Sequence, residues 1–118
     1  MKRILIAEDE KLFRIMLSDF IEQFDYEVVA AEDGAMAWDL FNKSEFDLVI
    51  TDINMPNMNG IELLKRVRSV KPDLPLIVIT GVSLESVHTS AKDYGASDLL
   101  IKPFKMKDLL GSVSRLLS

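Results

Sequence analysis

Short apolar segments of the sequence end in residues with charged or hydroxyl side chains. These are Glu8 and Asp9 after residues 4–7, Asp52 after residues 46–51, Thr80 at the end of residues 74–80, and Lys102 after residues 97–101. Carboxylates gathered at one place repel one another and raise at least one pKa unless a cation lies between them. Mg²⁺ prefers one or two carboxylates together with water and phosphate oxygens. We therefore expect Asp9 and Asp52 to bind Mg²⁺ directly and Glu8 to bind it through water.

The same residue types suit the transfer of a phosphoryl group. An aspartate carboxylate can attack phosphorus and form an aspartyl phosphate. Because the transition state of this transfer is loose, the site needs mainly charge neutralisation and alignment. The Lys102 ammonium supplies positive charge to one phosphoryl oxygen, and the Thr80 hydroxyl can donate a hydrogen bond to another. The pattern predicts that Asp52 accepts a phosphoryl group.

Five strands and five helices are predicted to position these residues. The β-branched apolar runs that predict strands are residues 4–7, 26–31, 46–51, 74–80 and 97–101. Helical periodicity occurs between and after these runs. The stripe of the first helix that is predicted to face the sheet consists of Leu12, Phe13, Met16, Leu17, Phe20, Ile21 and Phe24. The fifth helix is predicted from Leu109, Leu110, Val113, Leu116 and Leu117.

Several helix ends also carry sequence signals. Asp33 introduces the second helix, and Asn59, with a glutamate three residues later, resembles a capping box that opens the third. Ser83 is predicted to cap the fourth helix, and Gly95 to end it. Glu10 is interpreted as a solvated surface residue.

The alternation of strand and helix predicts right-handed crossovers and a parallel sheet covered on both faces. The sequence contains no repeat and no linker rich in Pro, Gly or Ser, so residues 1–118 are expected to form one (βα)₅ domain. Ligands of open α/β sheets bind outside the carboxyl ends of the strands. The chemically active residues are therefore expected to meet at one edge of the sheet.

Composition excludes several classes of function. The 19 acidic and 14 basic residues give a net charge of −5, the wrong sign for a domain that binds nucleic acid directly by itself. Cysteine is absent and histidine occurs once, which excludes disulfides, thiol nucleophiles and a two-histidine metal site within one chain. His88 is interpreted as a surface or partly buried helix residue. The apolar runs are too short to cross a membrane and no signal peptide is visible, so we expect a cytoplasmic protein without membrane insertion.

The motifs together resemble the receiver domain of bacterial two-component response regulators. They are Ala7-Glu8-Asp9-Glu10, Asp52-Ile53-Asn54-Met55-Pro56 with Gly60, Thr80-Gly81, and Lys102-Pro103-Phe104. The resemblance covers the whole chain, and the motifs occur in order at the predicted strand ends. It implies a flavodoxin-like parallel sheet of order 2-1-3-4-5 and a signalling switch that catalyses only its own phosphorylation and slow dephosphorylation.

The resemblance also implies roles and partners. Asp52 would take a phosphoryl group from the phosphohistidine of a sensor kinase or a phosphotransfer protein. Mg²⁺ would be held by Asp9, Asp52 and the backbone carbonyl of Asn54, with Glu8 in the outer shell. The peptide between Lys102 and the following proline would be cis. A downstream protein or an appended output domain would read the face formed by the fourth helix, fifth strand and fifth helix, and the chain would be a monomer, or a dimer on phosphorylation.

The sequence departs from the family at Leu99, three residues before the lysine, where Tyr or Phe is usual. A leucine has no ring or hydroxyl to swing between buried and exposed positions, so the usual coupling of threonine to an aromatic residue is not expected in this chain. Gly81 is expected to leave the site open to small phosphodonors. Asn54 and Val82 occupy family positions that tune dephosphorylation.

Three other functions fit parts of the pattern. Asp52 and Asn54 resemble the DxD motif of Mg²⁺-dependent phosphohydrolases, although that motif follows the first strand and here it follows the third. A flavin or nucleotide carrier would need a glycine-rich phosphate loop, which the five glycines do not form. A receiver-like module that binds a partner without phosphorylation is the third alternative, which the substitution at Leu99 keeps open.

Overall fold

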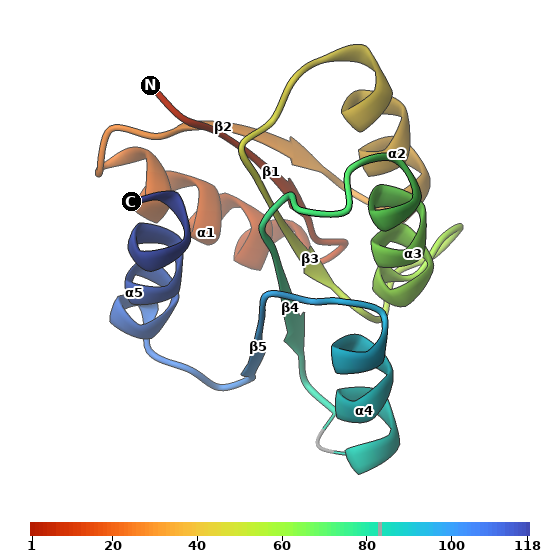
Figure 1. Ribbon diagram of the computed structural model, residues 1–118. Coiled ribbons are helices and arrows are strands. Elements are labelled where there is room, and N and C mark those ends of the chain that lie inside the picture. Colours follow the sequence, from red (N-terminus) through yellow and green to blue (C-terminus); the bar gives the residue numbers. More distant parts are fainter. Residues whose placement is uncertain (83) are drawn as a thin grey trace.

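The apolar segments form one five-stranded parallel sheet with the order β2-β1-β3-β4-β5 (Figure 1). The computed structural model describes residues 1–82 and 84–118. The strands are β1 (Arg3–Ala7), β2 (Glu27–Ala31), β3 (Leu48–Asp52), β4 (Leu76–Thr80) and β5 (Asp98–Ile101). Each is within two residues of the segment that sequence patterning predicts. The flavodoxin-like (βα)₅ fold and its strand order are therefore confirmed.

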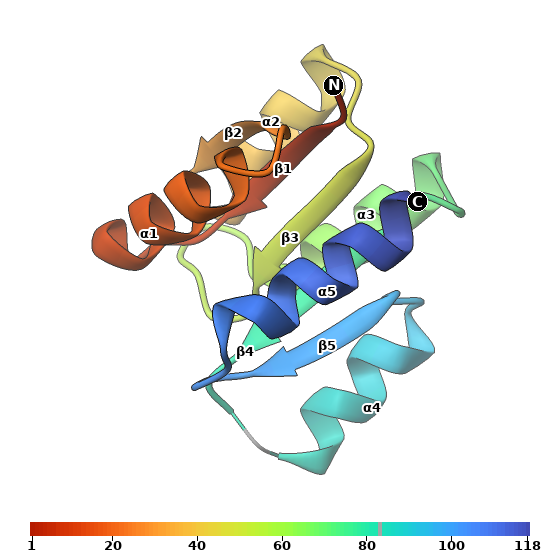
Figure 2. The ribbon, with the colours of Figure 1, turned by 90° about the vertical axis from the view of Figure 1, so that its left-hand side faces the viewer.

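Within residues 1–82 and 84–118, five helices cover the sheet on both faces. They are α1 (Lys11–Glu22), α2 (Gly34–Lys43), α3 (Gly60–Val70), α4 (Glu85–Asp93) and α5 (Met106–Leu117). Helices α1 and α5 lie on one face and α2, α3 and α4 on the other, as Figure 2 shows from the side of α1 and α5. None of the described helices is long and apolar enough to span a membrane.

The sheet divides the apolar core into two clusters. All residues of β3 and β4 are buried, and successive side chains of each strand contribute to opposite clusters. In β1, for example, Ile4 and Ile6 pack under α1 and α5, whereas Leu5 and Ala7 pack under α2 and α3. Burial on both faces explains why these strands read as continuous apolar runs.

The predicted helix signals are mostly confirmed. The Asp33 and Asn59 side chains each accept a backbone N–H three residues on, at 2.7 and 2.9 Å. Gly95 follows α4 with a φ of 92°, a left-handed conformation that glycine adopts without strain. The predicted cap Ser83 lies outside the described residues, and Leu84 occupies the cap position of α4 without a side-chain hydrogen bond.

Helix α1 differs from the prediction in two respects. Leu17 and Ile21 are buried, but Leu12 is 75% exposed and Met16 is 50% exposed, so the buried stripe is narrower than predicted. These two residues are rotated by about 100° from the row that contacts the sheet, which places them at the edge of the apolar face. Glu10 is not merely a solvated residue, since its carboxylate caps α1 by accepting two backbone N–H groups.

Candidate functional site

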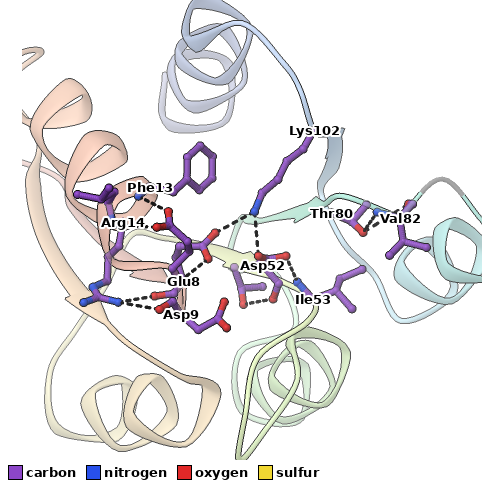
Figure 3. Close-up of polar contacts among 12 residues, drawn as sticks. Glu8, Asp9, Phe13, Arg14, Asp52, Ile53, Thr80, Val82 and Lys102 are labelled. Carbon is purple, nitrogen blue, oxygen red and sulfur yellow. Dashed lines mark hydrogen bonds and ion pairs between the residues drawn. The ribbon is translucent and has the colours of Figure 1, made fainter.

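Parallel pairing brings the predicted site residues to one edge of the sheet. Because Ala7 pairs with Thr51 across β1 and β3, and Thr80 pairs with Ile101 across β4 and β5, the residues that follow these strands emerge side by side. Figure 3 shows the result: the Glu8 and Asp52 side chains meet the end of the Lys102 side chain, with Asp9 beside Glu8. The structure thus gathers residues that are up to 94 positions apart.

The carboxylates of Glu8, Asp9 and Asp52 form one acidic cluster. One oxygen of each lies within 4.8 Å of the other two. Glu8 and Asp52 are buried, with 1% and 7% of their surface exposed, whereas Asp9 is exposed. Oxygen ligands of Mg²⁺ lie about 2.1 Å from the ion, so ligands on opposite sides are about 4.2 Å apart. The cluster fits a Mg²⁺ ion after small side-chain movements.

Lys102 lies between the two buried carboxylates. Its Nζ donates to Asp52 Oδ2 at 3.0 Å and to Glu8 Oε1 at 3.2 Å. The other oxygens are also bound, because the N–H of Ile53 donates to Asp52 Oδ1 at 2.7 Å and the N–H of Glu10 to Glu8 Oε2 at 3.0 Å. The ammonium offsets the repulsion that two buried carboxylates would otherwise exert.

The charge balance of this cluster shows in two pKa values. Burial, aided by the negative charge of Asp52, raises the pKa of Glu8 to about 7, although the N–H of Glu10 and the Lys102 ammonium act in the opposite direction. Burial alone would lower the pKa of Lys102, but its hydrogen bonds and proximity to Asp52 and Glu8 outweigh burial and raise it. Lys102 is therefore positively charged at neutral pH, which a residue that binds phosphate requires.

Two residues of α1 support the site, and the sequence analysis did not assign them to it. The Phe13 ring lies under Lys102, with Nζ 4.5 Å from the ring centre, and it contacts Phe104 edge to face. The Arg14 guanidinium donates to the backbone oxygens of Glu8 at 2.9 Å and Asp9 at 3.4 Å. Their place one turn into the helix that follows the acidic pair is the sequence signal that could have identified them.

Gly60 allows the loop after β3 to fold back on Asp52. Its N–H donates to the Ile53 carbonyl at 2.8 Å, and a Cβ built at this position would lie 2.1 Å from the Asp52 carbonyl oxygen. Close approach of two backbone segments, and not a positive φ, is thus the reason for glycine here. Asn54 lies within this loop, two residues beyond Asp52, and is exposed.

Thr80 reaches the predicted edge, but its hydroxyl is directed elsewhere. The side chain is fully buried, and Oγ1 accepts the N–H of Val82 at 2.9 Å while lying 3.4 Å from the Val82 carbonyl oxygen. In Figure 3 this pair lies on the side of Asp52 away from α1. Among the described contacts of Thr80, the side-chain hydrogen bonds are thus local to the loop after β4.

The surroundings of the cluster are open on the side of α1. A depression of about 570 Å³ is lined by Phe13, Met16, Gly81, Lys102, Pro103 and Phe104. Gly81 is exposed, and a Cβ at this position would meet nothing within 4 Å. The Lys102–Pro103 peptide is cis, as the resemblance implied. Leu99 of β5 packs against the apolar core on the face of the sheet that α4 covers.

Comparison with known proteins identifies the family. The sequence model described as the response regulator receiver domain matches residues 4–114. The response regulator receiver protein CpdR of Brucella abortus is 36% identical over 117 residues, which cover 99% of this chain and 98% of CpdR. The transcriptional regulator NtrC of Rhizobium meliloti is 33% identical, but the match covers 98% of this chain and 24% of NtrC.

A solved structure agrees with this result. The response regulator TrrA of Thermotoga maritima, determined in complex with Mg²⁺ and BeF, superposes with a TM-score of 0.91 and 34% identity, covering 99% of this chain and all of TrrA. Receiver domains are phosphorylated signalling switches that bind Mg²⁺ at an acidic site and interact with histidine kinases and output domains. The acidic pocket of Glu8, Asp9 and Asp52 fits such a site. The chain belongs to the family of response regulator receiver domains of two-component signalling systems.

Proposed function

We propose that Asp52 is the phosphoryl acceptor of this domain and that its phosphorylation switches the affinity of the domain for a partner. The observation that carries this proposal is the contact of Lys102 with Asp52 at 3.0 Å beside the acidic cluster. Asp52 is buried at the end of a central strand, where Lys102 and the N–H of Ile53 hold its carboxylate, and 7% of its surface stays exposed. A fixed nucleophile next to a fixed cation suits phosphoryl transfer.

The acidic cluster would hold Mg²⁺ through Asp9, Asp52 and the backbone carbonyl of Asn54, with Glu8 acting through water. When bound, Mg²⁺ supplies charge neutralisation and alignment to the phosphoryl oxygens. Three carboxylates and a carbonyl are hard oxygen donors, which is the donor set that this ion prefers. The exposure of Asp9 leaves a side of the cluster that water and phosphate oxygens can reach.

Residues of this chain carry out the other steps of phosphoryl transfer. An Asp52 carboxylate oxygen attacks phosphorus, and the bond from phosphorus to the donor's leaving group breaks. Lys102 stays charged and moves its contact from the free carboxylate to a phosphoryl oxygen. Thr80 donates its hydroxyl hydrogen to another phosphoryl oxygen, which requires it to leave Val82. Phe13 and Arg14 keep Lys102 and the acidic loop in position.

This function differs from turnover by a phosphohydrolase. Asp52 is the last residue of β3, whereas the DxD motif of those enzymes follows the first strand. We propose that the domain catalyses its own phosphorylation and slow dephosphorylation and nothing further. Residues 1–118 would form one receiver domain that acts in the cytoplasm, where its phosphodonor kinase exposes its phosphohistidine.

Labelling with a small phosphodonor tests the assignment of Asp52. The chain is incubated with Mg²⁺ and acetyl phosphate, and its intact mass is followed over time. We expect the mass to increase by one phosphoryl group in the native chain and to stay unchanged in Asp52→Asn. Labelling of equal extent in both proteins would contradict the proposal, and so would sustained hydrolysis of phosphomonoesters by the native chain.

We also propose that the protein phosphodonor docks on α1 next to Lys102. Leu12, Ile15 and Met16 are 75%, 45% and 50% exposed, and Met16 lines the depression that leads to the Lys102 ammonium. A phosphohistidine can reach Asp52 from this side, so an apolar rim here would contribute burial to the encounter. These exposed apolar side chains favour a protein donor with an apolar surface around its phosphohistidine.

A charge placed on this apolar rim should slow docking of the protein donor without slowing the phosphoryl-transfer chemistry at Asp52. We expect Leu12→Asp to lower the rate of transfer from an autophosphorylated histidine kinase at least tenfold, while labelling by acetyl phosphate keeps its native rate. Val70→Asp, at a residue of α3 that is 55% exposed, is the matched control and should transfer normally. Equal transfer rates for the two variants would exclude the α1 surface.

A further inference from the structure

The Thr80 hydroxyl is joined to α4 by a short chain of hydrogen bonds. Thr80 Oγ1 accepts the N–H of Val82 at 2.9 Å, and the carbonyl oxygen of Val82 lies 3.3 Å from Nε2 of His88 on α4. Backbone and ring thus connect the end of β4 to the first turns of α4. With the Nε2–H tautomer, His88 donates to this carbonyl. The His88 ring therefore depends on the position of Val82, a residue whose backbone Thr80 also holds.

This chain of contacts is sensitive to phosphorylation because, among the described residues, the acceptor of the Thr80 hydroxyl hydrogen is distant. Its described acceptor is the Val82 carbonyl at 3.4 Å, a long contact. Phosphoryl oxygens on Asp52 would carry negative charge, and hydrogen bonds to charged acceptors are roughly twice as strong as neutral ones. Rotation of Thr80 toward them takes its hydroxyl away from both the N–H and the carbonyl oxygen of Val82, so the backbone at Val82 must reorient.

The structure also offers the His88 ring a second position. A cavity of about 300 Å³ between α4 and β5 is lined by His88, Ala91, Lys92, Ala96, Asp98 and Leu99. A water molecule's share of liquid volume is about 30 Å³, so the cavity has room for an imidazole ring. The Asp98 carboxylate does not compete for this space, because it accepts from Ser112 and Arg115 of α5 on the other face of the sheet. Leu99 is too small to fill this space and has no polar group that senses Thr80.

We infer that His88 is the positioning residue that reports the state of Thr80 to the α4–β5 surface, in place of the residue at position 99. When Thr80 turns to a phosphoryl group on Asp52, the backbone at Val82 reorients and releases the His88 ring, which moves into the cavity beside Leu99. The inference rests on the proposed function of Asp52. It adds the route by which the phosphoryl group changes a surface that a partner can read.

The single histidine of the chain allows a direct test. Nuclear magnetic resonance of the ¹⁵N- and ¹³C-labelled chain follows the His88 ring alone, before and after addition of Mg²⁺ with beryllium fluoride as a phosphoryl analogue. The ¹⁹F signal of bound fluoride independently reports occupancy of Asp52. We expect the His88 ring signals to shift in the native chain and in Thr80→Ser, which keeps the hydroxyl, and to stay at their free positions in Thr80→Val.

A pair of His88 variants tests whether the ring transmits the change. His88→Gln keeps a side-chain N–H donor, and His88→Leu removes it. With equal ¹⁹F occupancy, the backbone amide shifts of Lys92 and Leu99 on adding the analogue should persist in His88→Gln and vanish in His88→Leu. Bound fluoride without any shift of the His88 ring, or with the same shift in Thr80→Val, would overturn the inference and leave the role of Asp52 intact. Absence of bound fluoride in the native chain would overturn both.

Discussion

Replacement of Glu8 by glutamine should change stability by an amount that depends on pH. Burial raises the pKa of Glu8 from 4.5 to about 7. The folded chain therefore holds the Glu8 proton more tightly than the unfolded chain, and this stabilisation is complete below about pH 4.5 and disappears as the pH rises through about 7. At about 1.4 kcal/mol per pKa unit, the full effect is about 3 kcal/mol. Of this, about 2 kcal/mol falls between about pH 5.5 and pH 8.5.

Urea unfolding followed by the fluorescence of Trp38, the single tryptophan, measures this effect. The experiment is run without divalent ions. We expect the unfolding free energy of the native chain, minus that of Glu8→Gln, to fall by about 2 kcal/mol from about pH 5.5 to pH 8.5. Glu22→Gln, an exposed acid on α1, controls for the loss of one charge. A difference for Glu8→Gln that stays flat across this range would refute the assignment of a buried, protonatable Glu8.

Two further predictions concern the loop after β3 and the metal. Gly60→Ala should lower the unfolding free energy by about 1–3 kcal/mol or more, because its Cβ would lie 2.1 Å from the Asp52 carbonyl oxygen. Gly111→Ala, in the interior of α5 with nothing within 4 Å of its Cβ, should raise the unfolding free energy by about 0.5–1 kcal/mol. Urea unfolding compares the two variants, and equal effects would contradict the argument. Mg²⁺ at about 100 times its dissociation constant should stabilise the native chain by about 2.7 kcal/mol in thermal unfolding. Asp9→Asn should need far more Mg²⁺ for the same gain and Asp19→Asn should not, so identical Mg²⁺ titrations would exclude Asp9 as a ligand.

Much of the fold could be predicted because the sheet is buried on both faces. Strands such as β3 and β4 are short, wholly buried and mostly apolar, and the helices repeat apolar residues at helical spacing. Parallel strands end at a common edge, so residues just beyond each strand had to meet. Glu8, Asp52 and Lys102 were predicted to lie together on this ground, and in the structure Lys102 Nζ lies 3.2 Å from Glu8 Oε1 and 3.0 Å from Asp52 Oδ2.

The sequence could not predict which side chains satisfy one another. Polar groups compete for partners, so the Thr80 hydroxyl bonds to Val82 in the structure although a phosphoryl oxygen was its expected partner. The contact of Phe13 with Lys102 depends on how α1 rotates over the sheet. The same rotation exposes Leu12, which periodicity alone assigns to the buried face. These features follow from packing geometry, which spacing along the chain does not encode.

The most direct test of the account is the chemical identity of the phosphorylated residue. After labelling with acetyl phosphate and Mg²⁺, borohydride reduces an aspartyl phosphate to homoserine, and tandem mass spectrometry of peptides locates the change. We expect homoserine at position 52, its loss when Mg²⁺ is removed by a chelator, and strong reduction of the yield in Lys102→Met. Homoserine at another acidic residue, or no homoserine in a labelled chain, would contradict the assignment of Asp52 as the acceptor.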